Sequence, residues 1–201
     1  MTLILKPDNS VDYEATYEHT HREHASYQSR NHGRLHFGIW HPEVELESPI
    51  LEVGCGNGKL CSRLASMGFQ VTGMDVVDGG YDRQGYAFRV FNIAKGIWPF
   101  ADRQFAWGLS FDVVEHIQES EIDHVLSELF RVTNNQVLSI PNCKAVGRLH
   151  VLVKPLDWWL SKLISLSDDR WKIVATVDRN KPGRPHDKVG IFIRQNELNY
   201  V

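Results

Sequence analysis

Three glycines at alternate positions form the part of the sequence best suited to holding a ligand. Gly54, Gly56 and Gly58 lie in Leu51–Leu60 (LEVGCGNGKL). The first of them directly follows the apolar run Ile50–Val53. Because glycine has no Cβ, such a loop can turn tightly between a buried strand and a helix and can approach a ligand closely. Tight strand-to-helix turns also use glycine for purely structural reasons, so the loop alone does not establish a binding site.

An acidic residue roughly 20 positions downstream strengthens the binding hypothesis. Asp75 follows the apolar run Gln70–Met74, where a carboxylate can accept hydrogen bonds from both ribose hydroxyls of a nucleoside. The glycine loop and Asp75 together predict a cofactor that contains a nucleoside. Lys59 occupies the place where the dinucleotide fingerprint needs its third glycine, so a dehydrogenase is the least favoured enzyme.

A second group of reactive side chains follows another apolar run, Phe105–Ser110. Asp112 and His116 come shortly after it, and ligands bind at the carboxyl ends of strands in open α/β sheets. His116 is the leading candidate for a general base, with packing or capping at the start of a helix as the alternative role. Asp112 is interpreted as a substrate contact, a helix cap or a hydrogen-bond acceptor on the cofactor side.

The elements that position these residues alternate between short apolar runs and helical segments. The runs predicted as strands are Ile50–Val53, Gln70–Met74, Ala87–Phe91, Phe105–Ser110 and Gln136–Ile140. Helices are expected at Lys59–Met67 and, with Ser120 and Asp123 as a capping box, up to Thr133. Asp78–Asp82 is poor helix material, so that crossover is expected to be irregular. This alternation indicates βαβ units, and so an α/β fold with a mostly parallel sheet.

The last 50 residues predict a helix and a hairpin. The helix is expected at Leu156–Leu166, followed by β-rich runs at Trp171–Val177 and Lys188–Arg194. Turn residues in Asp178–Asp187 join these runs, which predicts an antiparallel hairpin at the edge of the sheet. The hairpin loop is basic, through Arg179, Lys181, Arg184 and Lys188. We interpret it as a solvated turn, with contact to a phosphate or an acidic substrate as the alternative.

The N-terminal segment, residues 1–48, is expected to be helical and to belong to the same domain as residues 49–201. Residues that recur at steps of three and four would share one helix face; they are Tyr13, Tyr17, Thr20, His24, Tyr27 and Asn31. This face either packs on the domain or forms a lid over the active site. The histidines of this segment are interpreted as solvated or locally hydrogen-bonded, with His32 or His36 reaching the acceptor pocket as the alternative.

From about Pro49 to its end, the chain resembles the class I S-adenosylmethionine-dependent methyltransferases. Leu51–Leu60 is similar to the family's first motif, with Glu52 as its acidic residue, and Asp75 stands where the ribose-binding acid does. Asn92 and Ile93 stand where adenine is contacted, and Phe111–Ile117 matches the segment after the fourth strand. Thr133-Asn134-Asn135 departs from the usual Pro-Gly-Gly turn, which puts that turn in doubt and not the cofactor site.

The resemblance implies a Rossmann-like three-layer sandwich whose seven-stranded, mostly parallel sheet ends in a C-terminal antiparallel hairpin. It implies S-adenosylmethionine as cofactor and S-adenosylhomocysteine as product. The residues it assigns to cofactor binding are Glu52, Gly54, Cys55, Gly56, Asp75, Val76, Asn92, Ile93, Ser110 and Phe111. Those on the catalytic side are His116 and Asp112. The N-terminal helix and Asn142–Pro155 are expected to shape the acceptor pocket, since the family varies most there.

The metal content of the site is expected to be none. Asp112-x-x-Glu115-His116 does resemble a Glu-x-x-Glu-His segment that binds a divalent ion in small-RNA end methyltransferases and in some quinone-pathway O-methyltransferases. Two carboxylates and an imidazole are a reasonable ligand set for such an ion. Aspartate is shorter than glutamate, however, and many relatives without a metal carry a similar Glu-His pair. A metal-independent site is therefore the main expectation.

Composition limits the functions that remain. The 201 residues suffice for one domain, and their net charge of −3 gives no strong positive field for nucleic acid. Three cysteines, a short apolar start and no apolar run of membrane-spanning length predict a cytoplasmic protein with no membrane partner. We expect methyl transfer to an oxygen or nitrogen of a small-molecule or sugar-like acceptor. The alternatives are an RNA or protein methyltransferase and a catalytically silent nucleoside-binding module; the oligomeric state is not indicated.

Overall fold

The computed structural model describes residues 2–23, 44–79, 83–141, 149–167, 171–178 and 188–195. Its helices are α1 (Tyr13–Glu23), α4 (Lys59–Ser66), α5 (Ile122–Val132) and α6 (Leu156–Leu166), with a 3₁₀ turn, η2 (Val114–His116). Its strands are β1 (Ile50–Val53), β2 (Val71–Asp75), β3 (Ala87–Val90), β4 (Phe105–Phe111), β5 (Thr133–Pro141), β6 (Trp171–Asp178) and β7 (Lys188–Gln195). No helix among these residues is long and apolar enough to cross a membrane.

The strands form one sheet in the order β3-β2-β1-β4-β5-β7-β6. Strands β1 to β5 pair in parallel, whereas β7 is antiparallel to both β5 and β6. The chain moves outward from β1 through β2 to β3, then returns to the other side of β1 for β4. The carboxyl ends of β1 and β4 are therefore a topological switch point, where open α/β sheets bind ligands. The predicted Rossmann-like α/β fold is confirmed.

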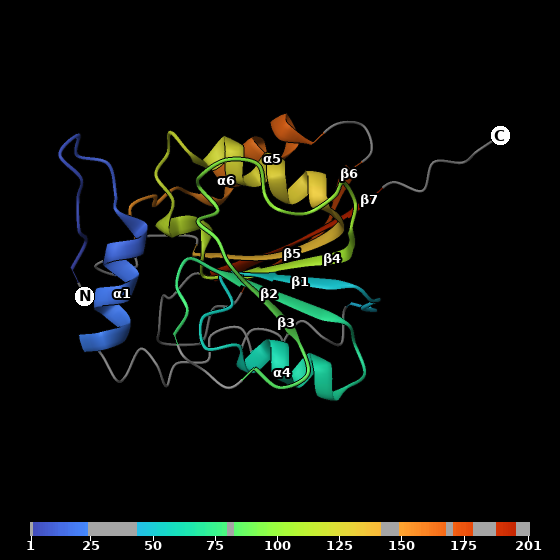
Figure 1. The fold of residues 1–201 in the computed structure, drawn as a ribbon. Coiled ribbons are helices and arrows are strands. Elements are labelled where there is room, and N and C mark those ends of the chain that lie inside the picture. The colour runs from blue at the N-terminus through green and yellow to red at the C-terminus, as the bar shows by residue number, and fades with distance from the viewer. Residues whose placement is uncertain are drawn as a thin grey trace.

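Helices cover both faces of the sheet, as Figure 1 shows. Helices α5 and α6 lie on one face and α4 on the other, while α1 lies beside one end of the sheet (Figure 1). All four residues of β1 are buried, as expected for a central parallel strand covered on both faces. This double burial explains why the strand is recognisable as a continuous apolar run.

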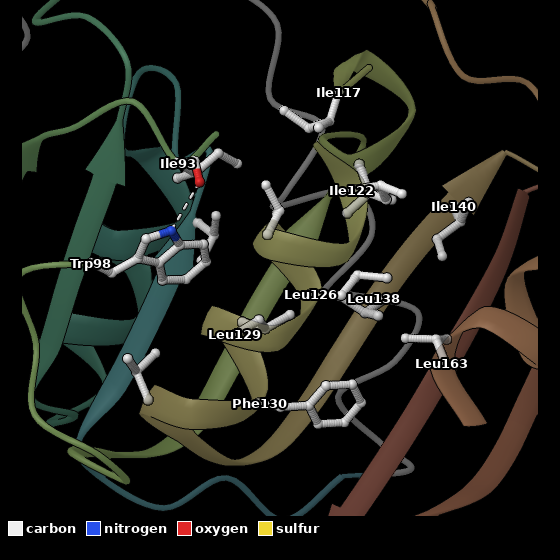
Figure 2. Close-up of a cluster of buried hydrophobic side chains, with 14 of the residues drawn as sticks. Ile93, Trp98, Ile117, Ile122, Leu126, Leu129, Phe130, Leu138, Ile140 and Leu163 are labelled. Atoms are coloured by element: carbon white, nitrogen blue, oxygen red, sulfur yellow. Dashed lines mark hydrogen bonds between the residues drawn. The ribbon is translucent and has the colours of Figure 1, made fainter. Parts of the chain in front are cut away.

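The core on the α5 face holds one of the loops near the switch point in place. Trp98 is 1% exposed and its indole Nε1–H donates to the carbonyl oxygen of Ile93 at 3.0 Å (Figure 2). Leu126 and Leu129 of α5 belong to the same buried cluster. Because the indole packs in the core and bonds to Ile93, it fixes the chain that follows β3, where Asn92 and Ile93 lie.

The structure corrects two predictions around α5. The helix begins at Ile122 after Glu121, with no side-chain cap, so the expected Ser120–Asp123 capping box is wrong. The predicted start of the fifth strand at Gln136 is also wrong, because β5 begins at Thr133, the residue after α5 ends. The Thr133 hydroxyl donates to the carbonyl oxygen of Leu129 at 2.7 Å, so it binds one of the last helical carbonyls in place of a glycine turn.

Other boundaries shift by a few residues. Strand β3 ends at Val90 instead of Phe91, and α4 ends at Ser66 instead of Met67. Helix α1 ends at Glu23, and residues 24–31 of the longer predicted helix lie outside the described residues. The described part of the crossover between β2 and β3 contains no helix, in agreement with the expectation for Asp78–Asp82.

Candidate active site

The glycine loop after β1 leaves room for a ligand at one position. Gly54 and Gly56 have φ angles of 67° and 53°, in the left-handed region that side chains rarely adopt. A Cβ at Gly54 would collide with the side chain of Val113, whereas a Cβ at Gly56 would meet nothing within 4 Å. The loop is therefore packed against the protein at Gly54 and faces open space at Gly56.

Asp75, at the end of β2, holds this loop in its conformation. Its Oδ2 accepts a hydrogen bond from the backbone N–H of Gly56 at 2.8 Å, and its Oδ1 accepts one from Val77 at 3.4 Å. The side chain is 9% exposed, and burial raises the pKa of its carboxyl above the ordinary value, although these hydrogen bonds act against that rise. Each carboxylate oxygen retains acceptor capacity for a further donor.

A pocket lies at the carboxyl ends of the strands and brings most of the predicted site residues together. The predicted residues that line it are Gly54, Asp75, Val76, Asn92, Ile93, Asp112 and His116. Tyr13 and Tyr17 of α1 complete the wall from outside the sheet. The cofactor-side and acceptor-side groups, which the sequence places far apart, therefore line one pocket at the switch point of the sheet.

Five predicted residues do not line this pocket; they are Glu52, Cys55, Gly56, Ser110 and Phe111. Glu52 lies behind the loop, where the Cys61 thiol donates to its Oε2 at 2.9 Å. Burial raises the pKa of Glu52 to about 8, so this carboxyl is mostly protonated at neutral pH. Glu52 is thus placed to support the glycine loop from within the core.

Helix α1 is fixed to the rim of the pocket by polar contacts. The Tyr13 hydroxyl donates to Glu121 at 2.6 Å and accepts from the backbone N–H of Gln118 at 2.9 Å. Glu14 accepts from the Asn92 side-chain amide at 3.0 Å and also pairs with Lys95 at 3.0 Å. In the described part of this face, Tyr13 is therefore bonded to the domain, and Tyr13 and Tyr17 line one side of the pocket.

The acceptor side of the pocket contains a buried carboxylate and two imidazoles. Asp112 has a φ angle of 58°, unusual for a residue with a side chain, and it lines the pocket together with His116. The Glu115 side chain is fully buried, with Oε1 at 4.0 Å from His116 Nε2 and 3.8 Å from His150 Nε2. One ligand atom from each of Glu115, His116 and His150 lies within 4.8 Å of the other two, so these residues are able to share a metal ion.

His150 is the residue of this group that the sequence analysis missed. It lies on the chain between β5 and α6, far from His116 in sequence. Its position is set by tertiary hydrogen bonds, because the carbonyl oxygen of Glu115 accepts from the backbone N–H groups of both Val151 and Leu152. In the sequence, His150 falls in Asn142–Pro155, the segment expected to shape the acceptor pocket.

Several predicted features lie outside the described residues. These are the histidines at positions 24, 32, 36 and 41, Tyr27 and Asn31, the hairpin-loop residues Arg179, Lys181 and Arg184, and the part of Asn142–Pro155 before residue 149. They stay predictions. Lys188 begins strand β7.

Comparison with known proteins gives one family and many similar folds. Residues 50–136 match the family described as "Methyltransferase domain". No curated protein matches the chain in sequence. The family match covers the glycine loop, Asp75, Asn92 and the segment with Asp112 and His116, which are the residues that meet at the pocket.

Three solved structures illustrate the range of similar folds. The 1,6-didemethyltoxoflavin-N1-methyltransferase of Burkholderia thailandensis is 12% identical, with a TM-score of 0.70 over 90% of this chain and 86% of that one. Magnesium protoporphyrin IX methyltransferase from Synechocystis is 16% identical, with a TM-score of 0.62 over 81% of each chain. Small RNA methyltransferase HEN1 is 15% identical, with a TM-score of 0.62 over 82% of this chain and 25% of that one.

At these identities the structural likeness supports the fold and says nothing of the acceptor. The family match is independent of it and covers the residues that form the pocket. Residues 50–136 therefore match a methyltransferase domain, and the chain shares its Rossmann-like fold with solved S-adenosylmethionine-dependent methyltransferases.

Proposed function

We propose that this enzyme transfers the methyl group of S-adenosylmethionine to an oxygen or nitrogen of a small-molecule or sugar-like acceptor. The observation that carries the proposal is the single pocket that Asp75, Asp112 and His116 share with the tyrosines of α1. A cavity closed on one side by a helix suits a compact acceptor better than a long polymer. The net charge of −3 also disfavours a nucleic-acid acceptor.

The residues around the glycine loop fit the proposed cofactor. We assign the ribose hydroxyls to Asp75, whose buried carboxylate lines the pocket beside the open space at Gly56. We assign adenine to Asn92 and Ile93, with Val76 on the same wall. The bound cofactor supplies a methyl group on a sulfonium, which is already an activated electrophile. Alignment of the acceptor is therefore the main task left to the protein.

The loop residues that do not line the pocket have supporting roles in this proposal. Glu52 and Cys55 lie in the core beneath the loop, and Ser110 and Phe111 end β4 beside it. The side chains of all four are less than one-tenth exposed. We infer that they act on the cofactor through the backbone positions that they fix.

His116 is the residue we assign to the acceptor. Its Nδ1 lies 2.9 Å from the carbonyl oxygen of Leu149, which fixes the ring, and its Nε2 lies 4.0 Å from Glu115 Oε1. A base is needed only if the acceptor loses a proton as it attacks, as a hydroxyl must. Asp112, which lines the same pocket, is assigned to orient the acceptor.

The acceptor class is tested with cofactor that carries an isotopically labelled methyl group. We expect label to enter small hydroxylated or amino compounds and not total RNA or a protein mixture. The His116→Ala variant is expected to lower kcat by roughly 100-fold or more while changing the affinity for S-adenosylhomocysteine by less than about twofold. His124→Ala is the matched control, since His124 is partly exposed and its Nε2 bonds the carbonyl oxygen of Gly96 outside the pocket. Preferential labelling of RNA would contradict the proposed acceptor, and equal losses of kcat and affinity in His116→Ala would make His116 structural.

A further inference from the structure

We propose that Glu115, His116 and His150 bind one divalent first-row transition metal ion. One donor atom from each residue lies within 4.8 Å of the other two. The donors come from η2 and from the chain that precedes α6, so the fold brings together groups that are distant in sequence. Binding of the ion depends only on this triad and not on the identity of the methyl acceptor.

The His116 ring is oriented as a metal ligand would be. A carbonyl oxygen only accepts hydrogen bonds, so Nδ1 donates to the oxygen of Leu149 at 2.9 Å. In a neutral imidazole the lone pair is then on Nε2, the nitrogen that lies 4.0 Å from Glu115. Two electron-pair donors face each other across this gap, which a cation between them would stabilise. Histidine ligands commonly donate their second nitrogen to a carbonyl oxygen in this way.

The backbone of Glu115 places His150. The Glu115 carbonyl oxygen accepts from the N–H groups of Val151 and Leu152, both at 3.0 Å. Leu149 and Leu152 are 4% and 2% exposed, so the chain on either side of His150 is anchored in the core. The two imidazole rings meet edge to face, with centroids 4.8 Å apart. The triad is therefore held together before any ion binds.

The donor spacing is compatible with a single ion. Metal–ligand bonds of about 2.1 Å place two ligands of one ion about 3.0–4.2 Å apart. The distances from Glu115 Oε1 to the two Nε2 atoms are 4.0 and 3.8 Å, so both lie within that range. A small rotation of the imidazoles would bring the remaining pair into range. The Glu115 side chain has no exposure to solvent, and a buried carboxylate is stabilised by a nearby cation.

The donor types select the class of ion. Two imidazole nitrogens and one carboxylate oxygen suit Mn²⁺, Fe²⁺, Co²⁺ or Zn²⁺, whereas Mg²⁺ and Ca²⁺ prefer oxygen ligands. The triad contains His150 and not Asp112. The ligand set therefore differs from the Asp112-x-x-Glu115-His116 set considered from the sequence, and this proposal departs from the expectation of no metal.

The site is next to the space we assign to the acceptor, because His116 lines the pocket. An ion there would bind an acceptor oxygen at an open coordination position and lower the pKa of its hydroxyl group. This role, unlike the binding itself, rests on the proposed function. His116 has one nitrogen for either task, so with the ion bound it is a ligand and not the base.

Titration with Co²⁺, followed by visible absorption, tests the site on the untagged full chain after treatment with a chelator. We expect one equivalent of Co²⁺ to produce d–d bands in the wild type, and millimolar Mg²⁺ to leave them unchanged. His150→Ala is expected to weaken Co²⁺ binding at least about tenfold, and Glu115→Gln to do the same. His124→Ala, which removes a histidine outside the triad, is expected to bind like the wild type.

The fold of each variant is checked by far-ultraviolet circular dichroism, since Glu115 is buried. His150 is partly exposed, at 18% of its side chain, so its variant keeps the test valid if Glu115→Gln does not fold. Co²⁺ affinity that is equal in the wild type and His150→Ala would overturn the site, as would displacement by Mg²⁺. S-adenosylhomocysteine is titrated into the same samples. A protein that binds S-adenosylhomocysteine but not Co²⁺ would overturn the metal site alone. A protein that binds Co²⁺ but not S-adenosylhomocysteine would overturn the proposed function alone.

Discussion

At the scale of single residues, Asp75 combines two tasks. Its carboxylate accepts the backbone N–H of Gly56, which holds the glycine loop, and it also lines the pocket where we place the ribose. The spacing from the glycine loop to Asp75 made this residue predictable from the sequence. The hydrogen bond between them follows from the parallel pairing of β1 with β2, which puts both strand ends at one edge.

Asp75→Ala is expected to weaken binding of S-adenosylhomocysteine by about 10- to 150-fold. This corresponds to roughly 1.5–3 kcal/mol for hydrogen bonds to a charged group. Isothermal titration calorimetry measures the change. Asp78→Ala is the control, because Asp78 is half-exposed and pairs with Arg83 outside this pocket. Unchanged affinity in Asp75→Ala would contradict the placement of the cofactor.

Glu52 predicts a pH dependence of stability that a surface glutamate would not give. Burial raises its pKa from 4.5 to about 8, so between these values the folded protein retains a proton that the unfolded chain has lost. The contribution of Glu52 to the free energy of unfolding is therefore fully present below about pH 4.5. It falls as the pH rises to about 8, by at most about 1.4 kcal/mol per pH unit. Glu52→Gln keeps an acceptor for the Cys61 thiol and removes the titration.

Urea denaturation of the wild type and Glu52→Gln at pH 5.5–8.5 measures this effect as the difference between the two stability curves. The difference is the relevant quantity because Asp75, whose pKa is also raised by burial, titrates in both proteins. We expect Glu52→Gln to gain stability relative to the wild type as pH rises. Parallel curves would mean that Glu52 is ionised in the folded protein at neutral pH.

At the scale of elements, the loop between β1 and α4 depends on its left-handed glycines. Gly56 and Gly68 share a positive φ and have no atom within 4 Å of an added Cβ, but Gly68 lies after the far end of α4. Gly56→Val and Gly68→Val are thus a matched pair. Both are expected to lose roughly 1–2 kcal/mol or more of stability through backbone strain.

Cofactor affinity is expected to separate the two variants. Gly56→Val would fill the open space beside Asp75 and weaken S-adenosylhomocysteine binding strongly, whereas Gly68→Val would leave it unchanged. Calorimetry on both proteins, with urea denaturation to compare their stabilities, provides the measurement. If the two variants bound the cofactor equally well, the open space at Gly56 would not be the binding site.

Helix α1 is the second element whose placement can be tested. Tyr13→Phe removes the hydroxyl that accepts from Gln118 and donates to Glu121, which is expected to weaken docking of α1 by about 1–3 kcal/mol. Hydrogen exchange of the α1 amides should accelerate, and S-adenosylhomocysteine affinity should fall because Tyr13 lines the pocket. Arg22→Ala is the control, since its ion pair with Glu23 is well exposed and contributes little. Equal exchange in both variants would show that the Tyr13 contacts do not hold the helix.

The bounds of an element could be predicted from the sequence where its buried residues form an apolar run. They were harder to predict where the buried side chains are polar. Strand β1 is apolar and fully buried, so its bounds followed from the sequence. The start of β5 did not, because Thr133 and Gln136 are fully buried yet polar. Gln136 donates to the Thr133 hydroxyl at 3.1 Å, and Asn135 donates to the carbonyl oxygen of Ala106 at 3.1 Å. These bonds depend on tertiary neighbours that a local pattern does not reveal.

At the scale of the whole molecule, the strand order explains why one pocket collects residues from distant segments. The reversal between β1 and β4 brings Gly54, Asp75, Asp112 and His116 to one edge of the sheet. The family resemblance predicted this edge and the cofactor. It did not predict that Glu115 and His150 meet there, because that juxtaposition depends on the backbone bonds between Glu115 and the chain after His150.

The most direct test of the account is calorimetric titration of the purified protein with S-adenosylhomocysteine, with NAD titrated in parallel. The two ligands share an adenosine, so the comparison tests the identity of the cofactor and not only the presence of a nucleoside site. We predict micromolar binding of S-adenosylhomocysteine and no measurable binding of NAD. Absence of S-adenosylhomocysteine binding, or a preference for NAD, would contradict the assignment of this pocket to methyl transfer.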